Sequence, residues 1–208
     1  MMRRENGTAV PAGSALGPAC VAVLSMYSGI MVAKRTIAKI TEREEALVSA
    51  LKTFPVTETA KRHFKILPTD FVLRYGFLFT PTARPKKIQK GTPEECFANA
   101  AKLVTAHSEL VYCEGYALNA KSGFPIKHAW VTDGSGHAID NTWTNGVAYA
   151  GVPLTRAYVL IAMLKYKVFV SMIDDWEHGH PLLRDLADRP EDWLDQASKG
   201  RVALANLR

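Results

Sequence analysis

The segment from residue 128 to 143 constrains the fold more than any other, because its pattern is that of a β-hairpin. Two runs suited to strands, 128–133 and 137–143, flank the turn-forming sequence Gly-Ser-Gly at 134–136. A further apolar run at 110–118 is typical of another strand. Strands joined by short connections pair antiparallel, so the sequence predicts an antiparallel sheet in the middle of the chain.

The loop between the two runs decides which side chains share a face. A three-residue loop with Gly136 in the left-handed conformation places Trp130 opposite Asp140. His128 then lies on the same face as a diagonal neighbour of Asp140, within reach of its carboxylate. A two-residue loop would shift the pairing by one residue and place Asn141 opposite His128. Either residue can orient a histidine, and the placement of the glycines favours the first register.

A helix is predicted from Thr92 to about His107. Thr92 suits the N-cap, Pro93 suits the first helical position, and Glu95 can complete a capping box. Cys96 would lie in the first turn, where the positive end of the helix dipole and the unpaired backbone N–H groups favour a thiolate. The two glutamates that precede this cysteine act in the opposite direction. A small side chain packed under the helix is its alternative role.

Other segments have simpler patterns. Apolar residues recur at three- and four-residue steps between residues 36 and 54, which predicts a helix ended by Pro55. Alternation at 71–79 predicts a buried strand, and the apolar segment 155–169 predicts a helix leading into a strand. Together with the central sheet, these elements indicate an α+β fold in which the helix that carries Cys96 packs on the antiparallel sheet.

Cysteine, histidine and carboxylate in this order are the groups that acyl transfer through a thiolate requires. Cys96 would attack a carbonyl carbon, and His128 would stabilise the thiolate and later protonate the leaving group. Asp140, or Asn141 in the other register, would orient the imidazole. The backbone N–H of Cys96 and the side chain of Gln89 are candidate oxyanion donors, with an ordinary loop position as the alternative for Gln89.

This order of motifs resembles the transglutaminase-like branch of the papain-like cysteine-fold superfamily. The resemblance is carried by Cys96 at a helix start, His-Ala-Trp at 128–130 and Asp-Asn-Thr-Trp at 140–143, and it covers about residues 89–153. It implies a papain-like core with the cysteine as nucleophile, the histidine as base and the aspartate as third member. Two features depart from the branch: the hairpin is tighter than in many members, and Asn141 replaces the common proline.

Three further residues are candidates for the walls of the cleft. Glu114 and Tyr116 occupy the strand between the nucleophile and the base, where they either line the cleft or pack in the core. Trp130 has the same two alternatives. Acidic residues and two histidines at 174–180 form a potential ligand set. No cysteine or third histidine has a matching spacing, so a solvated turn is favoured, and neither a metal nor a cofactor is predicted.

The chain has 208 residues, of which 48% are hydrophobic, and this suits one domain with its own core. Three cysteines are too few for a disulfide scaffold, which indicates a reducing, cytoplasmic compartment. An apolar run occupies 15–33, and we expect residues 1–35 to be an N-terminal extension, with a weak membrane anchor as the alternative. Residues 36–208 are expected to form a single papain-like domain with its catalytic core at about 89–153.

The net charge of +6 is unevenly distributed. Basic residues predominate at 34–90 and acidic residues at 174–195, which predicts two solvated faces. The basic stretch carries no recognisable nucleic-acid motif and no aromatic stacking pattern, so a nucleic-acid partner is not expected.

Together these features predict a cysteine-dependent hydrolase or acyltransferase that acts on an amide or a thioester. Its substrate would be a peptide, a protein side chain or a small amide or thioester, and no stable membrane association is expected. We expect the catalytic side chains to be exposed, so that their substitution removes activity with little loss of stability. The alternative is a non-catalytic binding or interaction domain on the same fold.

Overall fold

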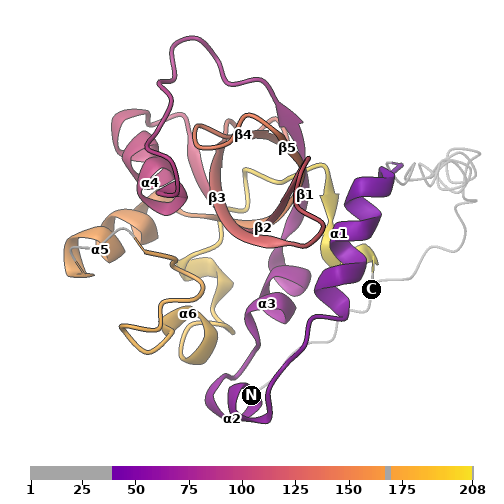
Figure 1. Cartoon of the computed structure of the whole chain (residues 1–208). Helices are drawn as coiled ribbons and strands as arrows, with labels where there is room; N and C mark the ends of the chain where they lie inside the picture. Colours follow the sequence, from indigo (N-terminus) through magenta and orange to yellow (C-terminus); the bar gives the residue numbers. More distant parts are fainter. Residues whose placement is uncertain (1–38, 167–169, 208) are drawn as a thin grey trace, which may run out of the picture. The chain divides into compact units, whose positions relative to one another are not determined.

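The computed structural model describes residues 39–166 and 170–207, which belong to one compact unit of mixed α and β structure (Figure 1). The α+β class is therefore confirmed. The expected N-terminal extension lies outside the described residues. The elements are α1 (Glu42–Lys52), α2 (Glu58–His63), α3 (Pro68–Tyr75), β1 (Phe77–Thr82), α4 (Cys96–Ala106), β2 (Val111–Asn119), β3 (Ile126–Thr132), β4 (His137–Ile139), β5 (Gly146–Leu154), α5 (Arg156–Tyr166), α6 (Pro181–Arg184), η2 (Pro190–Asp192), β6 (Val202–Ala203) and η3 (Leu204–Leu207).

The sheet closes on itself. Its strands follow the order β4-β3-β2-β5-β1-β6, and an additional pairing joins β4 to β1. The first five strands of this order therefore form a closed barrel, which Figure 1 shows as a ring with α4 beside β3. The closing pair is parallel, with Thr80 opposite His137, whereas the other strand pairs are antiparallel. The antiparallel pairing expected for the central strands is therefore confirmed. The closure by a parallel pair was not predicted, and a closed barrel is not the expected papain-like sheet.

Closure divides the side chains of the strands into an inner and an outer set. Residues directly opposite each other share a face, as Cys113 and Trp130 do in β2 and β3, and Phe79 and Tyr149 do in β1 and β5. These side chains face inward. The buried residues of this inner cluster are Phe79, Cys113, Ala117, Trp130, Ala138 and Tyr149.

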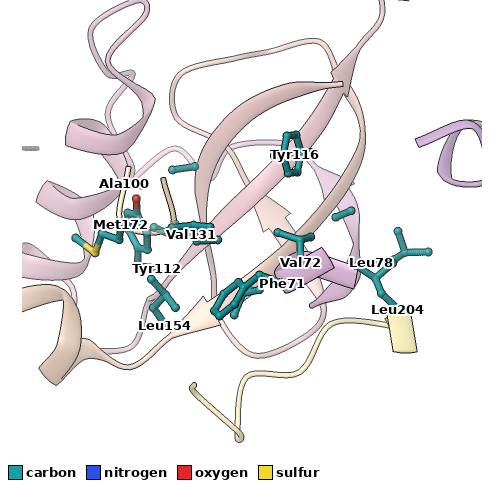
Figure 2. Close-up of a cluster of buried hydrophobic side chains, with 14 of the residues drawn as sticks. Phe71, Val72, Leu78, Ala100, Tyr112, Tyr116, Val131, Leu154, Met172 and Leu204 are labelled. Carbon is teal, nitrogen blue, oxygen red and sulfur yellow. The ribbon is translucent and has the colours of Figure 1, made fainter. Parts of the chain in front are cut away.

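The outer face of the barrel is covered by helices. Helix α4 packs against β3 and β2, whereas α1 and α3 pack against β5. The larger hydrophobic cluster lies in this layer, and Figure 2 shows Phe71 and Val72 of α3 among outward-facing side chains of the strands, including Tyr116 and Val131. The main core thus lies outside the barrel, and the barrel interior is a second, smaller core.

The hairpin adopts the register that its glycines favour. Val131 pairs with Ile139, which places Trp130 opposite Asp140. Gly134 and Gly136 both have a φ of +82°, a conformation that L-residues with side chains rarely adopt. The first of the two predicted registers is therefore confirmed.

The strand predicted at 71–79 is wrong in its first half. Residues 68–75 form α3, with Pro68 in its first turn, and the strand begins only at Phe77. The alternation of apolar residues predicted a strand where the structure has a helix. In this helix the consecutive residues Phe71, Val72 and Leu73 are all buried. So short an apolar run fits a strand as well as a helix, because it offers few turns of helical pattern.

The remaining helices agree more closely with prediction. The helix expected at 36–54 is present as α1, where Thr41 and Glu44 form a capping box. The helix expected at 155–169 is present as α5, and its predicted continuation falls partly on residues 167–169, outside the described residues. None of the helices described between residues 39 and 207 has the length and apolar character required to cross a membrane.

A glycine of β5 tests the packing inside the barrel. A Cβ on Gly151 would lie 2.5 Å from Cη2 of Trp130 and 2.6 Å from the backbone oxygen of Glu114. We expect Gly151→Ala to lower the free energy of unfolding by about 1–3 kcal/mol, because neither neighbour can move easily. Gly123→Ala is the control, since its Cβ meets no atom within 4 Å. Urea denaturation measures both variants, and equal effects would contradict this packing.

Candidate active site

The structure brings the candidate base and the candidate acid into direct contact. The imidazole Nε2 of His128 lies 2.7 Å from Oδ2 of Asp140. His128 comes from β3, and Asp140 directly follows β4. The carboxylate that sequence reasoning favoured over Asn141 is thus the group that contacts the imidazole.

The Asp140 carboxylate accepts three further hydrogen bonds. Oδ1 accepts from the backbone N–H groups of Thr142 and Trp143, at 2.8 and 2.9 Å. Oδ2 accepts from the hydroxyl of Tyr149 at 2.8 Å. Burial opposes ionisation, but the hydrogen bond and charge of His128, together with the other donors, lower the pKa of Asp140 below its usual value. The structure therefore holds Asp140 as an oriented anion.

Aromatic rings fix the plane of the His128 imidazole. The Trp143 ring stacks on it with 3.8 Å between the centroids and an interplanar angle of 18°. The rings of Trp130 and Tyr149 lie further away, at 6.5 and 6.3 Å. The imidazole is only 1% exposed, so its orientation is set by packing as well as by Asp140.

Cys96 lies in the first turn of α4, as predicted, but the helix begins at this residue and not at Pro93. Glu95 occupies the N-cap without a side-chain hydrogen bond, so the cap expected from Thr92 is wrong. The Asn99 side chain instead binds the backbone of Thr92, with Oδ1 accepting from its N–H at 3.1 Å and Nδ2 donating to its carbonyl at 2.7 Å. Glu94 has a positive φ of 67°, an uncommon conformation for glutamate.

Cys96 and Asp140 both raise the pKa of the His128 imidazole. Burial lowers the pKa of His128, but hydrogen bonds to Asp140 and to Cys96, and the charges of both groups, raise it to about 8. Nε2 of His128 contacts Asp140, so Nδ1 is the ring nitrogen that remains for a second partner. Cys96 and Asp140 therefore both favour the charged form of one imidazole.

All three side chains are more buried than sequence reasoning expected. Cys96 is 8% exposed, His128 1% and Asp140 5%. The expectation that these side chains are exposed is thus wrong, because α4 packs on β3 and the ring of Trp143 stacks on the imidazole. Substitution of Asp140 would leave several buried donors without their acceptor, so it would also reduce stability.

Two cavities lie near this group, and of its three side chains only Asp140 lines one of them. Gln89 and Asn141 line an open cleft of about 450 Å³ between the loop before α4 and the helix itself. Asp140, Trp143 and Tyr149 line a second cavity of about 280 Å³. Of the predicted cleft residues, Gln89 and Asn141 therefore lie together, next to the Asp140 segment.

The other predicted cleft residues lie elsewhere. Glu114 faces the outer layer, where its carboxylate accepts hydrogen bonds from the backbone N–H groups of Met172 and Ile173 at 2.8 and 3.0 Å. Tyr116 lines a separate, largely apolar cavity of about 230 Å³. Trp130 is fully buried in the barrel interior. These three residues are part of the packing and lie outside the two cavities that border Asp140 and Asn141.

In the acidic and histidine-rich segment at 174–180, each histidine lies close to an aspartate. Nδ1 of His178 lies 2.8 Å from Asp175, and Nδ1 of His180 lies 3.3 Å from Asp174. Across the described part of the chain, no group of three or more His, Cys, Asp or Glu side chains is arranged to hold a metal ion.

Sequence reasoning missed three residues that support the site. Nδ2 of Asn99 donates to the hydroxyl of Thr142 at 2.9 Å and so connects α4 to the segment after β4. The bond from the Thr142 N–H to Asp140 closes an Asx turn, which the Asp-Asn-Thr sequence itself could have indicated. Tyr149 could not have been found, because the strand that carries it was not predicted.

Comparisons with known proteins add no relative. The chain matches no known protein family, no curated protein and no solved structure.

An NMR titration tests the environment of His128. We expect its imidazole to titrate near pH 8, and Asp140→Asn to lower this midpoint because the variant removes the anion that stabilises the charged ring. Asp133→Asn, in the exposed loop of the same hairpin, is the matched control and should leave the midpoint unchanged. A titration midpoint of His128 that is the same in Asp140→Asn as in the wild type would contradict the contact between these two side chains.

The same pKa predicts how stability depends on pH. The folded pKa of His128, about 8, lies above the usual histidine value of 6.5, so its contribution is fully present below pH 6.5 and is lost as the pH rises through 8. We expect this loss to be about 2 kcal/mol or less in urea denaturation, and to be absent in His128→Gln. His137→Gln, at an exposed position of the same hairpin, should keep the wild-type slope.

Proposed function

We propose that this protein is a cysteine-dependent hydrolase or acyltransferase that acts on an amide or thioester through Cys96, His128 and Asp140. The observation that carries the proposal is the 2.7 Å contact between His128 and Asp140, with Cys96 at the start of α4 acting on the same imidazole. Its substrate would be a peptide, a protein side chain or a small amide or thioester.

In the first half-reaction, the Cys96 thiolate attacks the carbonyl carbon of the substrate, forming a C–S bond and an oxyanion. The first turn of a helix has backbone N–H groups without partners in the helix, and those of α4 would stabilise this oxyanion. His128 then donates its proton from Nδ1 to the leaving amine or thiol. The bond from the carbonyl carbon to that leaving group breaks, and an acyl-enzyme thioester remains.

In the second half-reaction, water or an acceptor amine attacks the thioester. His128, now neutral, takes the proton of this nucleophile through Nδ1. The C–S bond breaks, and the sulfur leaves as a thiolate beside the imidazolium. Asp140 stays ionised throughout and stabilises the positive charge on the ring.

As part of this proposal we place the chain in the transglutaminase-like branch of the papain-like superfamily. The support is the order of Cys96, His128 and Asp140 and the helix and strands that carry them. The barrel closed by β1 and β4 is not the sheet that this resemblance implies. The proposal therefore depends on the arrangement of the three side chains and not on the barrel.

One observation favours a second candidate function, a non-catalytic binding domain on the same fold. Cys96 is only 8% exposed, and Glu94 and Glu95 directly precede it. If no electrophile can reach the Cys96 thiol, the residues His128 and Asp140 have a structural role and not a catalytic one.

Thiol alkylation separates the two functions. In a Cys20→Ser background, we expect iodoacetamide to modify Cys96 at pH 6 at least about 10-fold faster than free cysteine, because the imidazolium stabilises the thiolate. His128→Ala should remove this advantage. Peptide mapping by mass spectrometry identifies the modified residue.

Cys113 provides the internal control. It lies fully buried inside the barrel, and burial raises the pKa of its thiol well above the usual value. It should therefore stay unmodified in the folded protein, and Cys113→Ser should leave the rate at Cys96 unchanged. If Cys96 reacts no faster than free cysteine, or is insensitive to His128→Ala, the binding domain is the better description.

A further inference from the structure

The cleft of about 450 Å³ beside the candidate active site follows one face of α4. Asn99, Leu103 and Ala106 line it at helical spacing. Cys96 does not line the cleft but lies one turn before Asn99 along the helix, just beyond the lining residues. The other wall is the loop that carries Gln89, and the cleft therefore extends along the helix away from the end that holds the sulfur.

Basic side chains predominate along this cleft. Lys87, Lys90 and Lys102 line it, and no aspartate or glutamate does. Acidic residues lie close by: the Glu109 carboxylate is 3.3 Å from Nζ of Lys87, Glu95 is 4.0 Å from Nζ of Lys102, and Glu94 precedes Glu95. The cleft lining itself carries three lysines and no carboxylate.

A buried acceptor marks the end of the cleft next to the catalytic group. Asn141 is 5% exposed, and its Oδ1 has no hydrogen-bond partner among the described residues. Its backbone is fixed, because its carbonyl accepts from the N–H of Gly91 at 2.7 Å. An unpaired buried carbonyl is unfavourable unless a ligand supplies a donor, and the N–H of an amide is such a donor.

We infer that this cleft is the substrate groove of the Cys96 centre, and that it takes substrates with an anionic group, a carboxylate or a phosphate, on the part that lies along α4. An N–H of the substrate would donate to Oδ1 of Asn141, and the lysines would bind the anion. This inference rests on the proposed function. It also gives a role to the lysines of the loop before α4, which the triad chemistry does not use.

Two alkylating reagents of similar size but different charge test the inference. Iodoacetate is anionic and iodoacetamide is neutral, so the ratio of their rates reports the potential at the sulfur. At low ionic strength we expect this ratio at Cys96 to exceed the ratio for free cysteine by about 5-fold, and to fall as salt is added. The triple variant K87Q/K90Q/K102Q should return the ratio to that of free cysteine.

The matched control is K61Q/K121Q/K199Q, which removes the same charge from exposed lysines outside the cleft. It should keep most of the wild-type preference. Far-UV circular dichroism checks that both triple variants are folded, and K90Q alone, with a smaller expected loss, replaces the triple variant if that protein does not fold.

Protection experiments distinguish the two anions. Inorganic phosphate and glutarate are each added at matched ionic strength, and we expect at least one to slow iodoacetamide at Cys96 in a saturable way. Phosphate alone indicates a phosphorylated substrate, and glutarate alone indicates a carboxylate. Protection by neither anion would overturn the inference. A rate ratio at Cys96 equal to that of free cysteine would also overturn it, and so would a ratio that both triple variants lower equally. Slow reaction with both reagents would instead contradict the proposed function itself.

Discussion

The Asp140 carboxylate is the interaction on which the candidate site depends. It joins the His128 imidazole on β3, the Tyr149 hydroxyl on β5 and the two backbone N–H groups that follow it. These donors come from segments separated by up to 21 positions in the chain, from His128 to Tyr149. A single buried anion thus fixes the geometry where the barrel meets the segment after β4, and the same donors that hold it also keep it ionised.

The barrel explains where the candidate catalytic side chains lie. Its interior is too small for more than one aromatic cluster, and the side chains of Phe79, Trp130 and Tyr149 fill it. His128 faces inward like Trp130 in the same strand, and Asp140 lies opposite Trp130. Both polar residues lie beyond the aromatic cluster, at one end of the barrel interior. Helix α4 brings Cys96 from the outer layer, and Asn99 connects its first turn to Thr142.

Sequence reasoning found the parts of the molecule that local chemistry determines. The glycines at 134 and 136 fix the hairpin register, and this register brings His128 to Asp140. The parallel pairing of β1 with β4 could not be foreseen, because no local signal encodes a contact between strands so distant in sequence. The burial of Cys96 was missed for the same reason, since burial depends on how the layers pack. The start of α4 was misjudged because a side chain seven residues after Thr92 replaces the expected local cap.

The stacking of Trp143 on His128 has a mechanical consequence. With an indole 3.8 Å from one face of the ring and a carboxylate on Nε2, the imidazole cannot rotate by half a turn about its Cβ–Cγ bond without breaking both contacts. The two nitrogens therefore keep their places as long as both contacts are made. In the proposed mechanism, every proton on the sulfur side would then pass through the same nitrogen, and the ring would be a fixed relay.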